Sequence, residues 1–156
     1  MRRMLPKVLD IIKKYRTNDP NELAERLGIK VKYADMMGGP NGIFIKFVKK
    51  QIILINKELD FDHQNVVLAH ELGHILLHQG GYHLFSMHTL KKDTMEQKEF
   101  EANKFAFLLI AHTCLRNNPD MIDGIRNEKR LTIDETVNLL KRVPESTVFY
   151  LSRRLK

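Results

Sequence analysis

The chain has 156 residues, of which 43% are hydrophobic and 29% charged, as is usual for a soluble protein of one compact domain. It has no internal repeat and no low-complexity tract, and its longest apolar run is far too short to span a membrane. The N-terminus lacks the pattern of a signal peptide, and the single cysteine, Cys114, excludes an internal disulfide bond and fits a reducing compartment. We therefore expect a cytoplasmic protein with no membrane partner.

The net charge of +7 favours anionic partners such as nucleic acid or acidic proteins. Lysine and arginine are nevertheless spread along the chain, and it has no aromatic-rich basic segment of the kind that binds single strands. We therefore expect any binding to nucleic acid to be non-specific.

The first third of the chain contains both helix and strand patterns. Two helices are predicted, over 5–15 and from the cap Asp19 to Gly28, and three strands, over 29–33, 43–48 and 52–56. The last two strands are predicted to form a hairpin, and a glycine-rich turn over 38–42 precedes them. These patterns predict an α+β fold in which a small antiparallel sheet lies beside a helical core.

The motif His70-Glu71-Leu72-Gly73-His74 follows the strands. Residues four apart lie on one face of a helix, so His70 and His74 can offer two imidazole nitrogens to one metal ion. Glu71 lies one step around the helix, where it can reach a water beside that ion without occupying a metal position. This arrangement is typical of zinc peptidases.

The helix that carries the motif is expected to turn both histidines toward the protein interior. At roughly 100° per residue they share one stripe with small and apolar residues: Val66, Val67, His70, Gly73, His74 and Leu77. Gly73 costs a helix about 1 kcal/mol relative to alanine, which suggests close packing there. Asp62 is expected to cap the first turn, and Gly80 and Gly81 to end the helix. An inward histidine can be an ordinary core residue, but two at this spacing favour a metal site.

A catalytic zinc ion usually has three protein ligands, so a third one is needed. His78 follows His74 by four residues, but successive positions at this spacing drift by about 40° around a straight helix and do not converge. We therefore expect His78 to support a ligand or to pack beside it.

A carboxylate on the next predicted helix is the preferred third ligand. This helix is expected to begin at the cap Asp93, and Glu99 lies at the edge of its apolar stripe, whereas Glu96 and Glu101 lie off it. A carboxylate on an inward face needs a partner, which a zinc ion would supply. The alternative is a salt bridge from Glu99 to a lysine or arginine.

The C-terminal part, from residue 116 to 156, is predicted to be a separate helical subdomain. Thr132-Ile133-Asp134-Glu135 is a capping box that opens a helix to about Lys141, and Pro144 begins another helix. The pair resembles a helix-turn-helix and has a basic end at Arg153, Arg154 and Lys156. We expect this unit to pack on the core, with direct contact to DNA as the alternative.

Two segments together resemble a known family. His70–His78 has the pattern H-E-L-G-H-x-x-L-H, and the segment from Glu99 to Ala106 has E-x-x-A-N-x-F-A. Both are similar to the signature of the ImmA/IrrE family of zinc metallopeptidases, and the resemblance covers roughly residues 4 to 112. It implies a zincin-like metallopeptidase domain over 1–115 with a gluzincin-like site. In this site His70, His74 and Glu99 would bind Zn²⁺, and Glu71 would be catalytic.

The resemblance also implies an activity, that of a zinc-dependent endopeptidase of restricted specificity. Its substrate would be a helix-turn-helix repressor of a phage or mobile element, because family members are often encoded beside such a repressor. The zinc ion would acidify a water and polarise the peptide carbonyl, and Glu71 would move the proton to the leaving amine. Tyr82, His83 and His88 are candidates, by position only, for a further donor to the developing oxyanion.

A second interpretation is a regulatory module that binds a repressor or DNA without cutting it. Its metal site would be structural or vestigial. The intact Glu71 argues against this interpretation, because a structural site does not need that acid.

Overall fold

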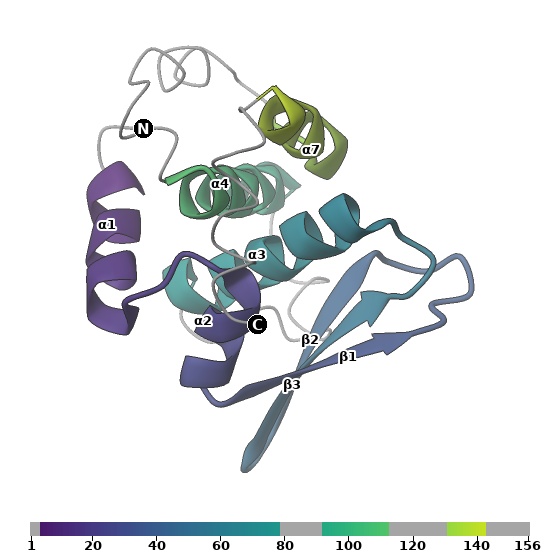
Figure 1. Ribbon diagram of the computed structural model, residues 1–156. Helices are drawn as coiled ribbons and strands as arrows, with labels where there is room; N and C mark the ends of the chain where they lie inside the picture. The colour runs from purple at the N-terminus through teal and green to yellow at the C-terminus, as the bar shows by residue number, and fades with distance from the viewer. Residues whose placement is uncertain (1–3, 79–91, 113–130, 143–156) are drawn as a thin grey trace.

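The computed structural model of the chain describes residues 4–78, 92–112 and 131–142 (Figure 1). Over these residues it has five helices and three strands, in the order α1 (Met4–Tyr15), α2 (Pro20–Arg26), β1 (Ile29–Ala34), β2 (Gly42–Phe47), β3 (Lys50–Asn56), α3 (Phe61–Leu77), α4 (Lys92–Ile110) and α7 (Ile133–Lys141). The α+β class predicted from the sequence is confirmed. No helix within the described ranges combines the length and the apolar character needed to cross a membrane.

The strands form one mixed sheet in the order β1-β3-β2. β2 and β3 are an antiparallel hairpin, as predicted, in which Phe44 lies opposite Ile53. β1, however, pairs with β3 in parallel, and Val31 also lies opposite Ile53. The prediction of a purely antiparallel sheet is therefore wrong for this pair. After β1 the chain crosses to the far edge of the sheet, so that β3 returns between the two other strands and runs in the direction of β1.

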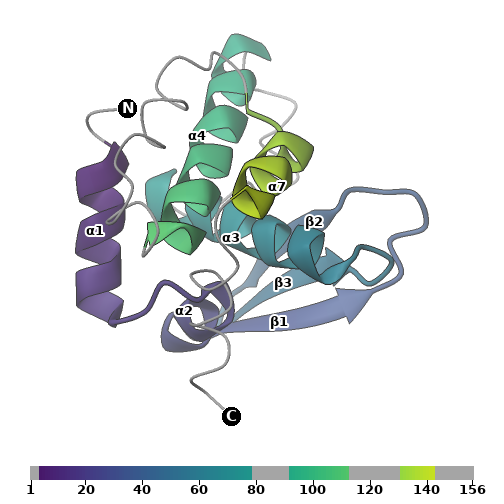
Figure 2. The same ribbon diagram turned by 45° about the horizontal axis from the view of Figure 1, so that its top comes forward.

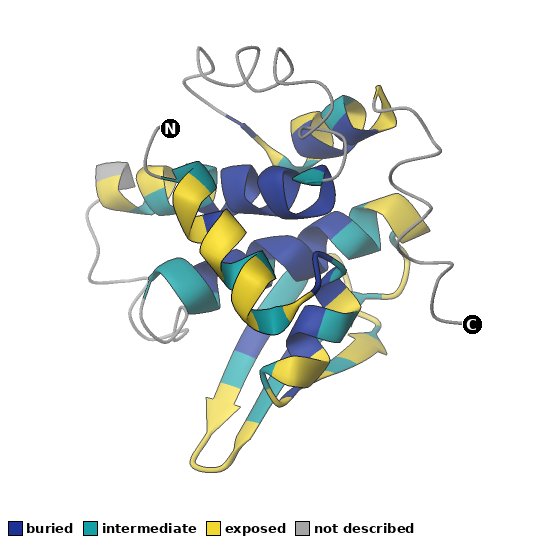
Figure 3. Cartoon of the chain, turned by 60° about the vertical axis from the view of Figure 1, so that its left-hand side comes forward, coloured by how far each residue is buried: buried dark blue, intermediate teal, exposed yellow. Residues whose placement is uncertain are grey.

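α3 lies between the sheet and α4, and α7 packs against both α3 and α4 (Figures 1 and 2). The buried residues of α3 are Val66, Val67, Leu68, Ala69, His70, Leu72, Gly73 and His74. The motif therefore faces inward, as predicted. Figure 3 shows that burial is greatest along α3 and α4, whereas the tip of the β2–β3 hairpin is exposed, with Val48 99% accessible.

Two predicted helix caps differ from the structure. Asp60, not Asp62, caps α3, and its carboxylate accepts a hydrogen bond from the backbone N–H of His63 at 2.9 Å. A capping residue needs extended backbone just outside the helix, and Asp62 lies inside the first turn because α3 already begins at Phe61. α4 likewise begins at Lys92, one residue before its predicted cap. α3 ends at Leu77 with His78 as its C-cap, before the predicted end at Gly80–Gly81, so that prediction is wrong. Everything predicted after Arg142 lies outside the described residues.

Gly73 marks a close approach of α3 to α4. A Cβ atom at this position would lie 3.0 Å from Cδ1 of Phe105, 3.2 Å from Cα of Ala102 and 3.3 Å from its carbonyl oxygen. Two of these three atoms belong to the backbone of α4, so space for a methyl group requires a shift of the whole helix. The close packing that the glycine suggested is confirmed.

We expect Gly73→Ala to lower the free energy of unfolding by up to about 2 kcal/mol. Alanine stabilises a helix by about 1 kcal/mol relative to glycine, but overpacking against a fixed backbone costs about 1–3 kcal/mol. Urea denaturation of the variant and the wild type measures the difference. An increase in stability would show that α4 can move away from α3 at little cost.

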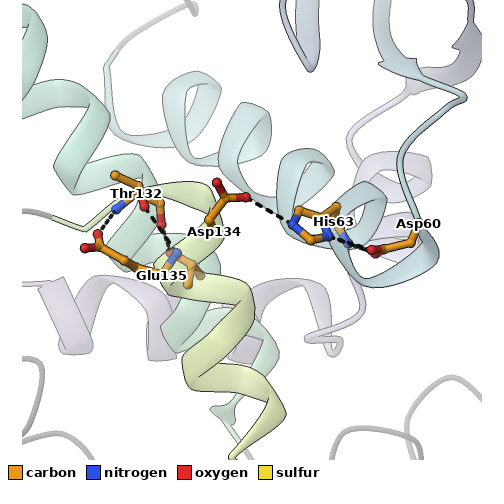
Figure 4. A network of polar contacts seen from close by, with 6 residues as sticks. Asp60, His63, Thr132, Asp134 and Glu135 are labelled. Carbon is orange, nitrogen blue, oxygen red and sulfur yellow. Dashed lines mark hydrogen bonds and ion pairs between the residues drawn. The ribbon is translucent and has the colours of Figure 1, made fainter.

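α7 is joined to the N-terminal end of α3 through His63 (Figure 4). Its Nδ1 lies 2.9 Å from the carboxylate of Asp60, and its Nε2 lies 3.1 Å from Oδ1 of Asp134 at the start of α7. The predicted capping box is present, since Thr132 accepts from the backbone N–H of Glu135 and the Glu135 side chain accepts from that of Thr132.

The hydrogen bond to Asp60 raises the pKa of His63; burial opposes this, and the bond to Asp134 adds to it. The pKa of Asp60 is lowered, first by the hydrogen bond from the backbone N–H of His63, then by the bond from the His63 ring, and further by the charge of Lys141.

These shifts predict how stability depends on pH. Because the pKa of His63 is raised on folding, its contribution is fully present below the ordinary value of 6.5 and is lost as the pH rises through the higher value of the folded state. The effect is expected to stay below about 1 kcal/mol, because the Asp134 side chain is 83% exposed. His63→Gln should remove this loss of stability above pH 6.5, as measured by urea denaturation across the range. An unchanged pH profile in the variant would contradict the assignment to His63.

Candidate metal centre

Three side chains from two helices meet at one point. The Nε2 atoms of His70 and His74, both on α3, lie 3.0 Å apart. The two carboxylate oxygens of Glu99, on α4, lie 3.2 Å from Nε2 of His70 and 3.1 Å from Nε2 of His74. One ligand atom from each residue lies within 4.8 Å of the other two, a grouping that could hold a metal ion. The structure thus brings together the three side chains that the sequence singled out as ligands.

Asn103 determines which nitrogen of His70 carries a proton. Its Nδ2 donates to the backbone carbonyl of Leu131 at 2.6 Å, so its Oδ1 faces Nδ1 of His70, at 2.7 Å. An amide oxygen can only accept, and therefore Nδ1 of His70 must donate. In the neutral imidazole this leaves Nε2 without a proton and with its lone pair directed at Glu99.

The chemistry of this donor set fits a cation. Nε2 of neutral His70 and the carboxylate of Glu99 are both acceptors, and two acceptors 3.2 Å apart repel each other unless a positive charge lies between them. The imidazoles are almost fully buried, with 5% and 4% of their side chains exposed, whereas Glu99 is 52% exposed. The cluster is therefore accessible from the side of Glu99.

The pKa shifts of Glu99 and His70 also favour positive charge at this point. Burial opposes ionisation of Glu99, but its hydrogen bonds to both imidazoles outweigh this and hold its pKa far below the usual range. Burial lowers the pKa of His74. For His70 the same effect is outweighed by the hydrogen bond to the carboxylate of Glu99 and by the charges of Glu71 and Glu99, so that its pKa is raised.

Glu71 lies beside this cluster and outside it. Its side chain runs along the start of β2, where a Cβ atom on Gly42 would lie 3.1 Å from Oε1 of Glu71 and 2.6 Å from Cγ1 of Val67. Burial raises the pKa of Glu71 to about 7; the charge of His70 lowers it and that of Glu99 raises it. A cation in the cluster would favour the ionised carboxylate. Because Gly42 has no side chain, β2 can lie close to Glu71, whose pKa is about 7.

His78 contacts a predicted ligand, as the helix geometry suggested. Its Nδ1 lies 3.1 Å from Nδ1 of His74, and its Nε2 lies 3.0 Å from Oε2 of Glu101. Sequence reasoning assigned no role to Asn103 or Glu101, although the former lies one helical turn after Glu99 and shares its face. The candidates Tyr82, His83 and His88 lie outside the described residues.

Comparison with known proteins identifies the class. The family model of the IrrE N-terminal-like domain, Peptidase_M78, matches residues 24–145. The "Metallopeptidase ImmA" of Bacillus subtilis (strain 168) is 34% identical over 126 residues, which are 79% of this chain and 72% of that protein. "Uncharacterized immunity region protein 2" of Bacillus phage phi105 is 31% identical over 142 residues, which are 86% of this chain and 79% of that protein. These similarities place the chain among the metallopeptidases. It belongs to the ImmA/IrrE family.

Proposed function

We propose that this protein is a zinc-dependent endopeptidase with a gluzincin-like site, in which His70, His74 and Glu99 bind the metal. The observation that supports this most strongly is the convergence of three acceptors, two imidazole nitrogens and a carboxylate, at one point between α3 and α4. Zinc is the metal proposed because catalytic zinc sites usually combine three protein ligands of this kind.

Glu71 is the proposed general base. A zinc ion bound to the three ligands would supply Lewis acidity, which polarises a peptide carbonyl and makes an attacking water more acidic. Glu71 is adjacent to His70 in the chain but outside the ligand set, so its carboxylate can accept a proton from the attacking water and pass it to the leaving amine. Asn103 holds the ring of His70 in place through both steps.

We further propose that the substrate is a helix-turn-helix repressor of a phage or mobile element, met in the cytoplasm. Support comes from the family resemblance and from the relative that is named for a phage immunity region. Cleavage would remove the repressor, and the protein would act as an anti-repressor.

The experiment that tests this proposal measures the intact mass of a repressor encoded beside the gene, after incubation with the zinc-loaded protein. Two fragments whose masses sum to the repressor plus one water would establish a site-specific peptidase and identify the bond. An uncut repressor that co-purifies with the zinc-loaded protein would favour the non-proteolytic binding module instead.

A further inference from the structure

We propose that His78 and Glu101 are positioning residues that keep a proton on Nδ1 of His74 and so direct the lone pair of its Nε2 toward the metal. The inference rests on the proposed metal site. It assigns a role to the last histidine of the H-E-L-G-H-x-x-L-H segment, and to a carboxylate that lies off the apolar stripe of α4.

The two residues form a hydrogen-bonded chain that ends at the ligand. Oε2 of Glu101 lies 3.0 Å from Nε2 of His78, and Nδ1 of His78 lies 3.1 Å from Nδ1 of His74. The side chain of His78 is only 7% exposed, so it is held between the two helices. The other oxygen of Glu101 accepts a hydrogen bond from Gln97 at 3.1 Å, which fixes the carboxylate in turn.

The positions of the protons follow from the acceptor at the end of this chain. An ionised carboxylate can only accept, so Nε2 of His78 must donate to Glu101. A neutral imidazole has one N–H, and therefore Nδ1 of His78 is an acceptor. Nδ1 of His74, which faces it, must then be the donor. In neutral His74 this leaves Nε2 unprotonated, on the side where it meets Glu99 and His70.

Without this chain, Glu99 would favour the wrong tautomer of His74. Oε1 of Glu99 lies 3.1 Å from Nε2 of His74, so it would accept a hydrogen bond from a proton on that nitrogen and stabilise it there. A proton on Nε2 would occupy the position that a metal needs. His78 and Glu101 therefore oppose Glu99 by offering an acceptor on the other side of the ring.

Both histidine ligands are thus oriented from a single turn of α4. Asn103 accepts from Nδ1 of His70 directly, and Glu101 acts on Nδ1 of His74 through His78. Partners of this kind, outside the ligand set, typically account for about 10- to 100-fold in metal affinity when removed.

The first test reads the tautomer of His74 in the metal-free protein. Nitrogen-15 NMR of the imidazoles, at a pH where they are neutral, should show the proton of His74 on Nδ1 in the wild type and on Nε2 in His78→Phe. His78→Gln should keep it on Nδ1, since an amide can accept from His74 and donate to Glu101. The same tautomer in all three proteins would overturn the inference, whether or not the protein binds zinc.

The second test measures the zinc dissociation constant by competition with a chelator. His78→Phe and Glu101→Ala should raise it about 10- to 100-fold, and His78→Gln should stay within about threefold of the wild type. Glu96→Ala, which removes an exposed carboxylate from the same helix, is the matched control and should not change it. Equal zinc affinity in His78→Phe and the wild type would overturn the inference, whereas a wild type that binds no zinc would overturn the proposed metal site itself.

Discussion

Glu71→Gln is expected to lower the rate of repressor cleavage by about 10²- to 10⁴-fold while the protein still binds one equivalent of zinc. Glutamine has the size and shape of the glutamate, so it fits the space beside Gly42 and Val67. It cannot accept a proton at neutral pH, and loss of a general base typically costs a rate factor of this size. The metal should remain, because Glu71 is not among the three residues that converge.

The measurement combines a time course of intact repressor mass with the zinc content of the purified variant. Glu96→Gln is the matched control, since it makes the same chemical change at an exposed position of α4 and should leave the rate unchanged. Cleavage at the wild-type rate by Glu71→Gln would eliminate Glu71 as the base. Loss of zinc from this variant would instead place Glu71 in the ligand set.

The second large effect is expected for Glu99→Ala, which should abolish tight zinc binding. The variant loses one of three ligands and the only carboxylate of the grouping formed by the described residues. Zinc stabilises a folded protein that binds it by about 2.7 kcal/mol at a free concentration of 100 times the dissociation constant. For a chain of this length that corresponds to an increase of about 5–10 °C in the melting temperature.

Thermal melts with and without zinc therefore distinguish the variants. The wild type should show the increase and Glu99→Ala should not. Glu101→Ala, two residues along the same helix, should still bind one equivalent and show an increase, although its weaker affinity requires more zinc. If Glu101→Ala lost the metal and Glu99→Ala kept it, the third ligand would be Glu101 and not Glu99.

The sequence predicted the centre of this fold well because the information there is local. The helical period alone predicts that His70, Gly73 and His74 share an inward face of α3. In the structure all three residues are buried. The sequence also predicts Glu99 as the third ligand, because a carboxylate at the edge of a buried stripe needs a partner. The structure brings it next to both histidines, while its role as a ligand stays a prediction.

The sheet shows where local patterns are not sufficient. Alternating residues identify β1 as a strand, but they do not say which strand lies beside it or in which direction. The parallel pairing of Val31 with Ile53 depends on the crossing of the chain between β1 and β2. That crossing is a property of the whole sheet, and no single segment encodes it.

Glu101 and Asn103 were missed for a similar reason. A stripe is calculated for one helix alone, and on α4 Glu101 lies away from the apolar face. Its partner His78 reaches it from α3, so the pair exists only once the two helices are packed. Asn103 likewise obtains its orientation from Leu131, a residue from another part of the chain.

The hydrogen bond between Asn103 and Leu131 also constrains when the site can be completed during synthesis. Leu131 is added to the chain 28 residues after Asn103, and its carbonyl is what turns the amide oxygen of Asn103 toward His70. A nascent chain that has produced both histidines and Glu99 therefore still lacks the contact that orients one imidazole. The contact that orients His70 can therefore form only after Leu131, which precedes α7, has been added to the chain.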